Sequence, residues 1–377
     1  MKIGITTFQW SENYGAVLQA HALQSFLRER NHDVQIVDYR VAVPVSWLRK
    51  WLAKTPRGCF QKWEAVYKTH LFEQFRKKYL KRTAEVFRSA AELRRIADRF
   101  DLLITGSDQV WNPQWLEQVD GLCDLFFLSF AEPQTRRISY AASFGHAGTS
   151  TMKKEWVEIV GEKLKQMDAI SVREPSGVSL VRDLCGRTGA VHVVDPTLLL
   201  ERSHYEKIAG AADVRGKYLF SYMLHGLEQD ADGVVAEIAG ALNLKVVKCD
   251  AHKTELHQGF TLPSPSGWLR QIRDADFVVT NSFHGAVFCL LFNIPFVVLL
   301  IQGPTSPMNS RITELLTAVG LENRIAGSGG SPIPGLLDEP IDWNGVHRQI
   351  ALMKTRAADF LNTQLFAVSK QQISNIQ

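Results

Sequence analysis

One histidine stands between two apolar runs in the segment DADFVVTNSFHGAVFCLLFNIPFVVLL, residues 274–300. This histidine is His284. The β-branched residues before it predict a buried strand at 276–280, and the apolar run after it predicts a helix over 286–292. Strand carboxyl ends and helix N-termini face the ligand in parallel α/β sheets, which predicts an anionic ligand at this turn. The alternative is a satisfied, half-buried histidine.

A carboxylate follows a second apolar run, in DLLITGSDQVWNP. Gly106 permits a tight turn, so Asp108 projects at the end of the strand, where it can accept a hydroxyl proton or hold a sugar hydroxyl. The alternative is that Asp108 caps a helix. Trp111 and Trp115 either offer a flat apolar face to a sugar ring or belong to the core.

Two arginines occupy comparable positions. Arg173 ends an apolar run in SVREPSG, just before a predicted helix N-terminus, and Arg311 follows Asn309 in NSRITELL. A guanidinium there can bind a carboxylate or a phosphate through two parallel hydrogen bonds. A structural ion pair of Arg173 with Glu174 or Asp183 is the alternative, and capping or surface pairing explains Asn309 and Arg311 equally well.

The elements that position these residues alternate between strands and helices. The hydrophobic periods predict strands at 2–8, 34–39, 102–105, 137–143, 169–173, 218–223, 244–248 and 276–280, with a further strand from Pro295. Helices are predicted at 13–30, 152–166, 176–184, 229–242, 266–273 and 286–292, with a last one from about 343. Two consecutive series of this kind predict an α/β protein with two Rossmann-like domains and a cleft between them.

Composition narrows the class of protein. The chain has 377 residues, 45% of them hydrophobic, and a net charge of only +4, so nucleic acid is not an expected partner. Five scattered cysteines without CxxC spacing indicate reduced core residues.

No signal peptide or long apolar stretch is evident, which predicts a cytoplasmic protein. A basic, tryptophan-bearing stretch at 45–63 indicates either a solvated helical face or peripheral contact at the inner face of a membrane.

Several motifs are missing. The turn SENYGA after the first strand lacks G-x-G-x-x-G, so a dinucleotide site has no support. Neither H-E-x-x-H nor G-x-S-x-G occurs. We therefore expect no metal, no cofactor and no serine nucleophile.

Seven segments taken together resemble the polysaccharide pyruvyl transferase family. They occur in the order of the family and read ENYGAVLQAHALQ, LLITGSDQVWNP, RISYAASFG, ISVREPSG, VVDPTLLL, VVTNSFHGAVFCLLFNIPFVVL and NSRITELL. The resemblance implies a GT-B-like fold and transfer of the pyruvyl group of phosphoenolpyruvate to two sugar hydroxyls, giving a cyclic ketal and phosphate. The acceptor would belong to a bacterial-type surface polysaccharide, such as an exopolysaccharide or capsule, or to its lipid-linked precursor.

From the two series of elements we expect three parts, and the resemblance implies their acceptor and donor roles. Residues 1–200 form the acceptor-side domain, with a helical, basic and aromatic insertion at about 45–97. Residues 201–340 form the donor-side domain, and residues 341–377 form a helix that packs back across both.

The resemblance also assigns residues. We expect His284 to act as general acid and Asp108, or a water that it orients, to accept protons from the sugar. Substrate contacts are expected from Arg173, Arg311, Asn309, Ser282, Asn281, Asn13, Tyr14 and Trp111. Some family members carry arginine two positions before the histidine, where this chain has Ser282. Part of the negative charge of the donor must therefore be held elsewhere.

Two other functions fit the same elements. A GT-B glycosyltransferase that uses a nucleotide sugar would have the same architecture, because a fold does not determine a function. A non-catalytic glycan-binding or assembly protein is the other alternative, favoured by the serine at position 282.

Overall fold

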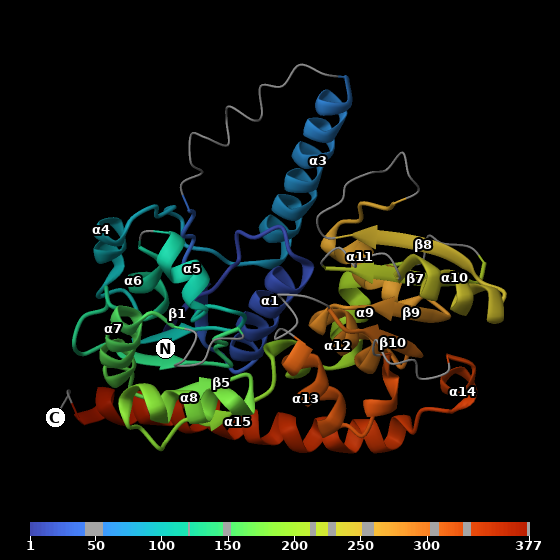
Figure 1. Cartoon of the computed structure of the whole chain (residues 1–377). Coiled ribbons are helices and arrows are strands. Elements are labelled where there is room, and N and C mark those ends of the chain that lie inside the picture. Colours follow the sequence, from blue (N-terminus) through green and yellow to red (C-terminus); the bar gives the residue numbers. More distant parts are fainter. Residues whose placement is uncertain are drawn as a thin grey trace.

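The computed structural model describes residues 1–41, 56–119, 121–145, 152–211, 216–224, 231–250, 260–301, 309–326 and 333–374. Two parallel sheets lie at opposite ends of the molecule, each with helices on its faces (Figure 1). Residues 45–55 of the basic stretch predicted at 45–63 lie outside the described residues.

The first sheet has the order β2-β1-β3-β4, with β1 at Lys2–Thr6, β2 at Asp33–Ile36, β3 at Leu102–Thr105 and β4 at Arg136–Ser139. Two short strands, β5 (Ser171–Val172) and β6 (Val191–His192), pair with each other. Single bridges connect Ala169 to β4, and β5 to Ala142 just beyond β4. All four residues of β3 are buried, as both faces of a parallel sheet require.

The second sheet repeats this order. Its strands run β11-β10-β9-β7-β8, with β7 at Tyr218–Met223, β8 at Lys245–Asp250, β9 at Phe277–Thr280, β10 at Phe296–Leu299 and β11 at Ile325–Ala326. In both sheets the first strand lies between the second and the third, so the strand order reverses between β1 and β3 and between β7 and β9. Ligands bind at such switch points, beyond the carboxyl ends of the strands.

Helices cover the two sheets and join them. The first domain carries α1 (Tyr14–Arg28), α3 (Pro56–Tyr79), α4 (Ala90–Leu93), α5 (Pro113–Gln118), α6 (Leu122–Phe126), α7 (Lys154–Lys165) and α8 (Pro175–Cys185). The second domain carries α9 (Arg202–Ala209), α10 (Ala231–Ala241), α11 (Pro265–Arg273), α12 (Phe283–Phe292), α13 (Ser310–Ala318) and α14 (Ile333–Asp338).

The last helix, α15 (Trp343–Ser374), runs along both domains (Figure 1). Near its start, His347 lies 2.7 Å from the side-chain oxygen of Asn293 in the second domain. Near its end, Gln364 accepts a hydrogen bond of 2.6 Å from Arg136 in the first domain. One continuous helix therefore contacts both sheet-bearing halves.

The two domains also share a hydrophobic core. The largest cluster of buried apolar side chains includes Ile5 and Leu18 of the first domain together with Phe220 and Leu290 of the second. Tyr14 of α1 stacks on Trp268 of α11 with ring centroids 5.2 Å apart. Helix α1 therefore packs against the second domain as well as its own sheet.

The predicted strands and helices are present, with shifted boundaries. Two predicted strands, at 137–143 and 169–173, are shorter in the structure because the left-handed backbone at Ala141 (φ 49°) ends the regular pairing of β4. The region 56–97, expected to be a helical insertion, contains the long helix α3, the short α4 and single bridges to the edge of the first sheet.

One arginine of α3 holds the loop between β1 and α1. The Arg76 guanidinium is buried and donates to the backbone carbonyls of Gln9 at 2.6 Å, Trp10 at 2.8 Å and Ser11 at 2.7 Å. This loop leads directly into Asn13, the N-cap of α1. A side chain far along the sequence thus fixes where α1 begins.

Replacing Arg76 with methionine should lower the free energy of unfolding by about 2–4 kcal/mol, because three carbonyls lose a charged donor. Urea denaturation measures the change. Lys77→Met, at the exposed neighbour, is the control and should change stability by less than about 0.5 kcal/mol. Equal effects of the two substitutions would contradict the assigned role of Arg76.

Candidate active site

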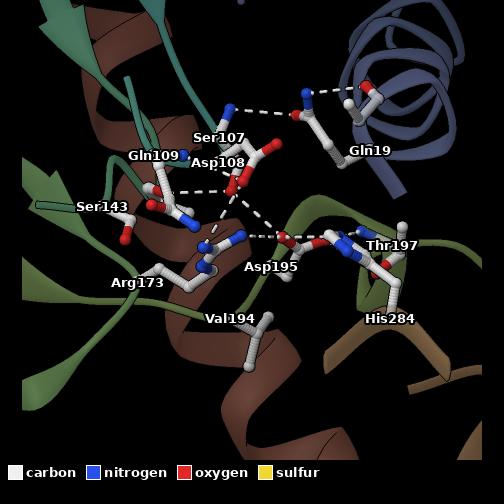
Figure 2. A network of polar contacts seen from close by, with 12 residues as sticks. Gln19, Ser107, Asp108, Gln109, Ser143, Arg173, Val194, Asp195, Thr197 and His284 are labelled. Atoms are coloured by element: carbon white, nitrogen blue, oxygen red, sulfur yellow. Dashed lines mark hydrogen bonds and ion pairs between the residues drawn. The ribbon is translucent and has the colours of Figure 1, made fainter. Parts of the chain in front are cut away.

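Asp195 lies at the centre of a buried polar network between the two domains (Figure 2). Its side chain has no exposed surface. One carboxylate oxygen accepts hydrogen bonds of 3.1 Å from both Ser107 and Arg173, and lies 3.4 Å from Nε2 of His284. The other accepts from the backbone and hydroxyl of Thr197, at 3.0 and 2.7 Å. Both oxygens are therefore fully engaged.

The surroundings keep Asp195 ionised. Burial alone would raise the pKa of this carboxyl, but His284 and Arg173 outweigh it and hold the pKa well below its usual range. A carboxylate only accepts hydrogen bonds. Nε2 of His284 must therefore carry the proton that faces Asp195, and Nδ1 is the nitrogen left for a substrate.

Arg173 follows β5 and is surrounded by acidic side chains. Its guanidinium lies 3.1 Å from Asp195, 3.3 Å from Glu174 and 3.7 Å from Asp108, and covers the Phe283 ring at 4.9 Å. Burial opposes its charge, but the three carboxylates outweigh burial and raise the pKa of the guanidinium above its ordinary value.

The structural ion pair considered for Arg173 is thus present with one of the two carboxylates named for it. Glu174 makes the pair, whereas Asp183 pairs with Arg182 on the surface, at 3.4 Å. The pair with Glu174 is buried rather than exposed, so it does not resemble an ordinary surface pair.

Asp108 lies three residues beyond the end of β3, beside the switch point. Its backbone is in the left-handed region, with φ 71°, which aspartate adopts more readily than most residues. One carboxylate oxygen accepts from the backbone of Gln109 at 2.9 Å, and the side chain is 20% exposed. Asn112, not Asp108, caps the following helix α5, so the capping alternative is wrong.

His284 is the second residue of α12 and lies against the first turn of α1. A Cβ built on Gly15 would lie 2.0 Å from Nδ1 of His284, 2.4 Å from Cγ and 2.6 Å from Cε1. Such similar distances to three ring atoms mean that Gly15 packs on the face of the imidazole. Only glycine leaves room for the ring at this position.

Arg311 lies one residue inside the start of α13 and is also buried. Burial, with Arg173 nearby, lowers the pKa of its guanidinium to about 10. With the Gln109 amide oxygen turned toward it, Arg311 can donate from both terminal nitrogens at 3.3 Å. Its Nε has no hydrogen-bond partner among the described residues.

The remaining predicted residues have internal partners. Asn13 and Ser282 cap α1 and α12 through the backbone amides of Ala16 and Gly285. Asn309 exchanges two hydrogen bonds with the backbone of Ile301, Asn281 accepts from the backbone of Leu224, and Tyr14 donates to the carbonyl of Pro263.

Trp111 requires a correction. Its indole has no exposed surface, donates to the carbonyl of Phe126 and stacks on Phe127, so it offers no face to a sugar. The ring belongs to a cluster of buried apolar side chains in the first domain, together with those of its sequence neighbours Val110 and Leu116. Trp115 is 45% exposed.

The sequence did not single out four participants: Asp195, Thr197, Ser107 and Gly15. Asp195 had a local signal, because it is the one charged residue in VHVVDPTLLL and directly precedes a proline. Gly15 and Ser107 had no local signal in the sequence. Gly15 matters because α12 packs against it, and Ser107 because Asp195 lies beside it.

Comparisons with known proteins identify the chain. A sequence profile of the polysaccharide pyruvyl transferase family matches residues 13–302. The chain belongs to this family. The resemblance predicted from the ordered motifs is therefore confirmed. No curated protein shows significant sequence similarity to the chain.

Solved structures share the fold of this pyruvyl transferase family member at low sequence identity. UDP-N-acetylglucosamine 2-epimerase from Rickettsia bellii is 10% identical, with a TM-score of 0.57 over 98% of this chain and 97% of that one. The UDP-GlcNAc 2-epimerase of Methanocaldococcus jannaschii, in complex with UDP-GlcNAc and UDP, is 12% identical, with a TM-score of 0.54 over 96% and 100%. The predicted α/β, GT-B-like fold with two Rossmann-like domains is thereby confirmed.

The described residues lack both a membrane-spanning helix and a cluster of metal ligands. None of their helices is long and apolar enough to cross a membrane. Nor do they contain a group of three or more His, Cys, Asp or Glu side chains arranged to hold a metal ion.

Asp195→Asn should lower the free energy of unfolding at pH 7 by about 3–5 kcal/mol, since it leaves a buried guanidinium with one partner fewer. Folding lowers the pKa of this aspartate, so its ionised form stabilises the folded state at pH values above the unfolded pKa of about 3.9. This stabilisation is lost as the pH falls from there toward the folded pKa. The difference in the free energy of unfolding between Asp195→Asn and wild type should therefore become smaller below about pH 4. Chemical denaturation across pH measures it.

The matched control for this prediction is Asp183→Asn, which removes an exposed carboxylate and should cost less than about 0.5 kcal/mol. A difference between Asp195→Asn and wild type that stayed constant down to strongly acidic pH would contradict the role of the buried charge.

Gly15→Ala should destabilise the protein by about 1–3 kcal/mol, because the new methyl group overlaps the His284 ring. The cost should largely disappear in the His284→Ala background, where the ring is gone, giving a strong coupling between the two sites. Melting temperatures of the four proteins in this double-mutant cycle measure the coupling.

Gly240→Ala is the control for the alanine substitution itself, because Gly240 is also helical and a Cβ there would meet nothing within 4 Å. It should be neutral or slightly stabilising. Additive effects of Gly15→Ala and His284→Ala would refute the contact.

Proposed function

We propose that this protein transfers the pyruvyl group of phosphoenolpyruvate to two hydroxyls of a sugar, forming a cyclic ketal and releasing phosphate. The observation that carries the proposal is a pair of buried guanidinium groups, each with an unused donor. Nε of Arg311 has no hydrogen-bond partner among the described residues. Nη2 of Arg173 makes no hydrogen bond either, because its ion-pair partner Asp108 lies 3.7 Å away, beyond hydrogen-bond distance. Buried donors are normally satisfied, so an anionic ligand is the natural acceptor for them.

The charges around these arginines limit which anion they hold. Arg173 and Arg311 lie near three carboxylates, those of Asp108, Glu174 and Asp195. Two positive and three negative groups leave one net negative charge while His284 is neutral. We assign the carboxylate of the donor, with its single charge, to the free donors of the two arginines.

Asp108 is the proposed proton acceptor for the sugar. Of the three carboxylates near Arg173, those of Asp195 and Glu174 are at most 4% exposed, whereas that of Asp108 is 20% exposed. A base must come within hydrogen-bond distance of the proton it removes, directly or through one water. Asp108 meets this requirement best.

Each of the two sugar hydroxyls loses a proton, and both protons are consumed within the reaction. When the first hydroxyl oxygen bonds to the central carbon of the donor, one proton is added to the methylene carbon, which becomes the methyl group of the ketal. When the second hydroxyl displaces phosphate, the electron pair of the broken C–O bond passes to the phosphate oxygen, and protonated His284 supplies the other proton. Asp108 collects a hydroxyl proton, and exchange through solvent returns the two residues to their starting states.

A lipid-linked acceptor is our proposal for the class of sugar substrate. On α3, the side chains of Trp63, Val66 and Tyr67 are 53%, 56% and 39% exposed, and the two aromatic rings stack in parallel. Exposed apolar side chains on a projecting helix suit contact with a lipid or a membrane surface. This part of the proposal includes peripheral membrane contact on the cytoplasmic side.

Incubation with phosphoenolpyruvate and a panel of free and lipid-linked glycans tests the function. We expect phosphate in equal amount to a product heavier by one pyruvyl ketal. A parallel arm replaces phosphoenolpyruvate with nucleotide sugars. Glycosyl transfer in that arm, with no ketal in the first, would replace our proposal with the glycosyltransferase alternative.

His284→Ala should lower phosphate release from phosphoenolpyruvate with the true acceptor by about 10²–10⁴-fold, the usual contribution of an acid or base. His347→Ala is the control, because this exposed histidine of α15 bonds to Asn293 and takes no part in the network around Asp195. Near-wild-type turnover of His284→Ala would remove His284 from the chemistry.

A further inference from the structure

Two histidines from different domains form a hydrogen bond outside the network around Asp195. His21 of α1 and His204 of α9 approach each other with their Nε2 atoms 2.9 Å apart. His21 is only 6% exposed, and the side chain of His204 is 27% exposed. These two residues, the histidine pair, therefore place two titratable rings at a contact between the domains.

The neighbours of the histidine pair determine where its protons lie. Nδ1 of His21 is 3.1 Å from the carbonyl oxygen of Tyr79, the last residue of α3, and a carbonyl only accepts hydrogen bonds. Nδ1 of neutral His21 therefore carries the proton, and its Nε2 is an acceptor. The Ser25 hydroxyl lies 3.3 Å from this Nε2 and is a longer, second contact. The hydrogen atom between the two rings must then belong to Nε2 of His204.

The histidine pair can take up one proton without losing this bond, but not two. Nδ1 of His204 lies 3.7 Å from the carboxylate of Glu29, at the end of α1. A proton added at this nitrogen forms an ion pair and leaves the bond between the rings intact. A second proton makes both Nε2 atoms donors. Two N–H groups would then face each other, so the contact between α1 and α9 would break.

The surroundings oppose these protons at neutral pH. Burial is the main cause that lowers the pKa of His21 to about 4, and the positive charges of His204 and Arg28 add to it. Burial and Lys207 also lower the pKa of His204, against the opposing effect of Glu29. Both rings are therefore neutral at pH 7.

Further groups face the histidine pair from the helices packed against it. Helix α3 contributes the rings of Phe75 and Tyr79, which meet His21 edge to face. A surface pocket beside His204 is lined by charged side chains of both signs from α1, α9, α15 and the residue before α9: Glu29, Arg30, Glu201, Lys207 and Lys354. Protons from solvent reach the pair through this pocket.

Both helices of the histidine pair also lead to the proposed active site. In α1, Gly15 packs on the ring of His284. In α9, Tyr205 donates to the carbonyl of Thr197 at 2.8 Å, and the Thr197 hydroxyl bonds to Asp195. Separating α1 from α9 would therefore disturb both sides of the contact between His284 and Asp195.

We propose that the histidine pair is a pH-sensitive contact between the two domains. It holds α1 on α9 while the pair carries at most one added proton, and it releases α1 when both rings are protonated. The inference goes beyond the proposed function, because it does not depend on which reaction the active site performs.

The direction of the pH effect follows from the lowered pKa of His21. The unfolded chain takes up a proton at this residue near the ordinary pKa of about 6.5, whereas the folded chain does so only near a pKa of about 4. Neutral His21 therefore costs the folded state nothing above about pH 6.5, and the cost grows as the pH falls toward 4.

His21→Gln tests this effect, because glutamine keeps an acceptor for His204 but takes up no proton. Urea denaturation at pH 7 and at pH 4.5 measures the folding equilibrium constant. Between these pH values the constant of wild type should fall at least about tenfold more than that of His21→Gln. His70→Gln, at an exposed histidine of α3, is the control and should behave as wild type. Equal losses in wild type and His21→Gln would overturn the inference.

His204→Ala distinguishes the histidine pair from a histidine that is merely buried. Without the partner ring, Nε2 of His21 can take up a proton without facing another N–H group. The pKa of His21, followed by NMR of its ring protons, should therefore rise by about one unit or more above its value in wild type. An unchanged pKa would show that burial alone sets it, and the proposed role of the pair would fail.

Hydrogen exchange tests whether protonation releases α1 from α9. Between pH 7 and pH 4.5, after correction for the intrinsic effect of pH, amides of α1 and α9 should gain about tenfold in exchange rate relative to those of α7. His21→Gln should show no such gain. An increase spread evenly over the chain, or one equal in His21→Gln, would contradict the release.

Discussion

The structure depends on one buried negative charge. Asp195 has no contact with solvent, and a carboxylate without water is stable only when it is paired and hydrogen-bonded. Its partners come from four places in the chain: Ser107 after β3, Arg173 after β5, Thr197 two residues beyond Asp195 itself, and His284 at the start of α12. Satisfying this charge therefore fixes strand ends of both domains relative to one another.

The two sheets have the same strand order, and this explains why the network is compact. Asp108 follows the third strand of the first sheet, and His284 follows the third strand of the second. Each thus lies beside the switch point of its own domain. Helix α1, which packs on the second domain through Tyr14, brings the two switch points together.

Much of this was predictable from local sequence. Period and composition predicted the strands and the order of elements, because buried parallel strands read as continuous apolar runs. His284, Asp108, Arg173 and Arg311 were found because each follows a strand or opens a helix. Trp111 was misjudged because an aromatic residue near a polar turn has the same local pattern whether its ring is buried or exposed. Asp195 and Gly15 act through contacts between distant segments, which one sequence does not reveal.

Helix α15 restrains the distance between the two halves of the active site. It is one unbroken helix of 32 residues that bonds to the second domain near its start and to the first near its end. Rotating one domain away from the other would pull His284 off Asp195 and would also bend or slide this helix. The helix is thus a splint: separating His284 from Asp195 would require it to bend or slide, and so it keeps the proposed acid beside its counter-ion between turnovers.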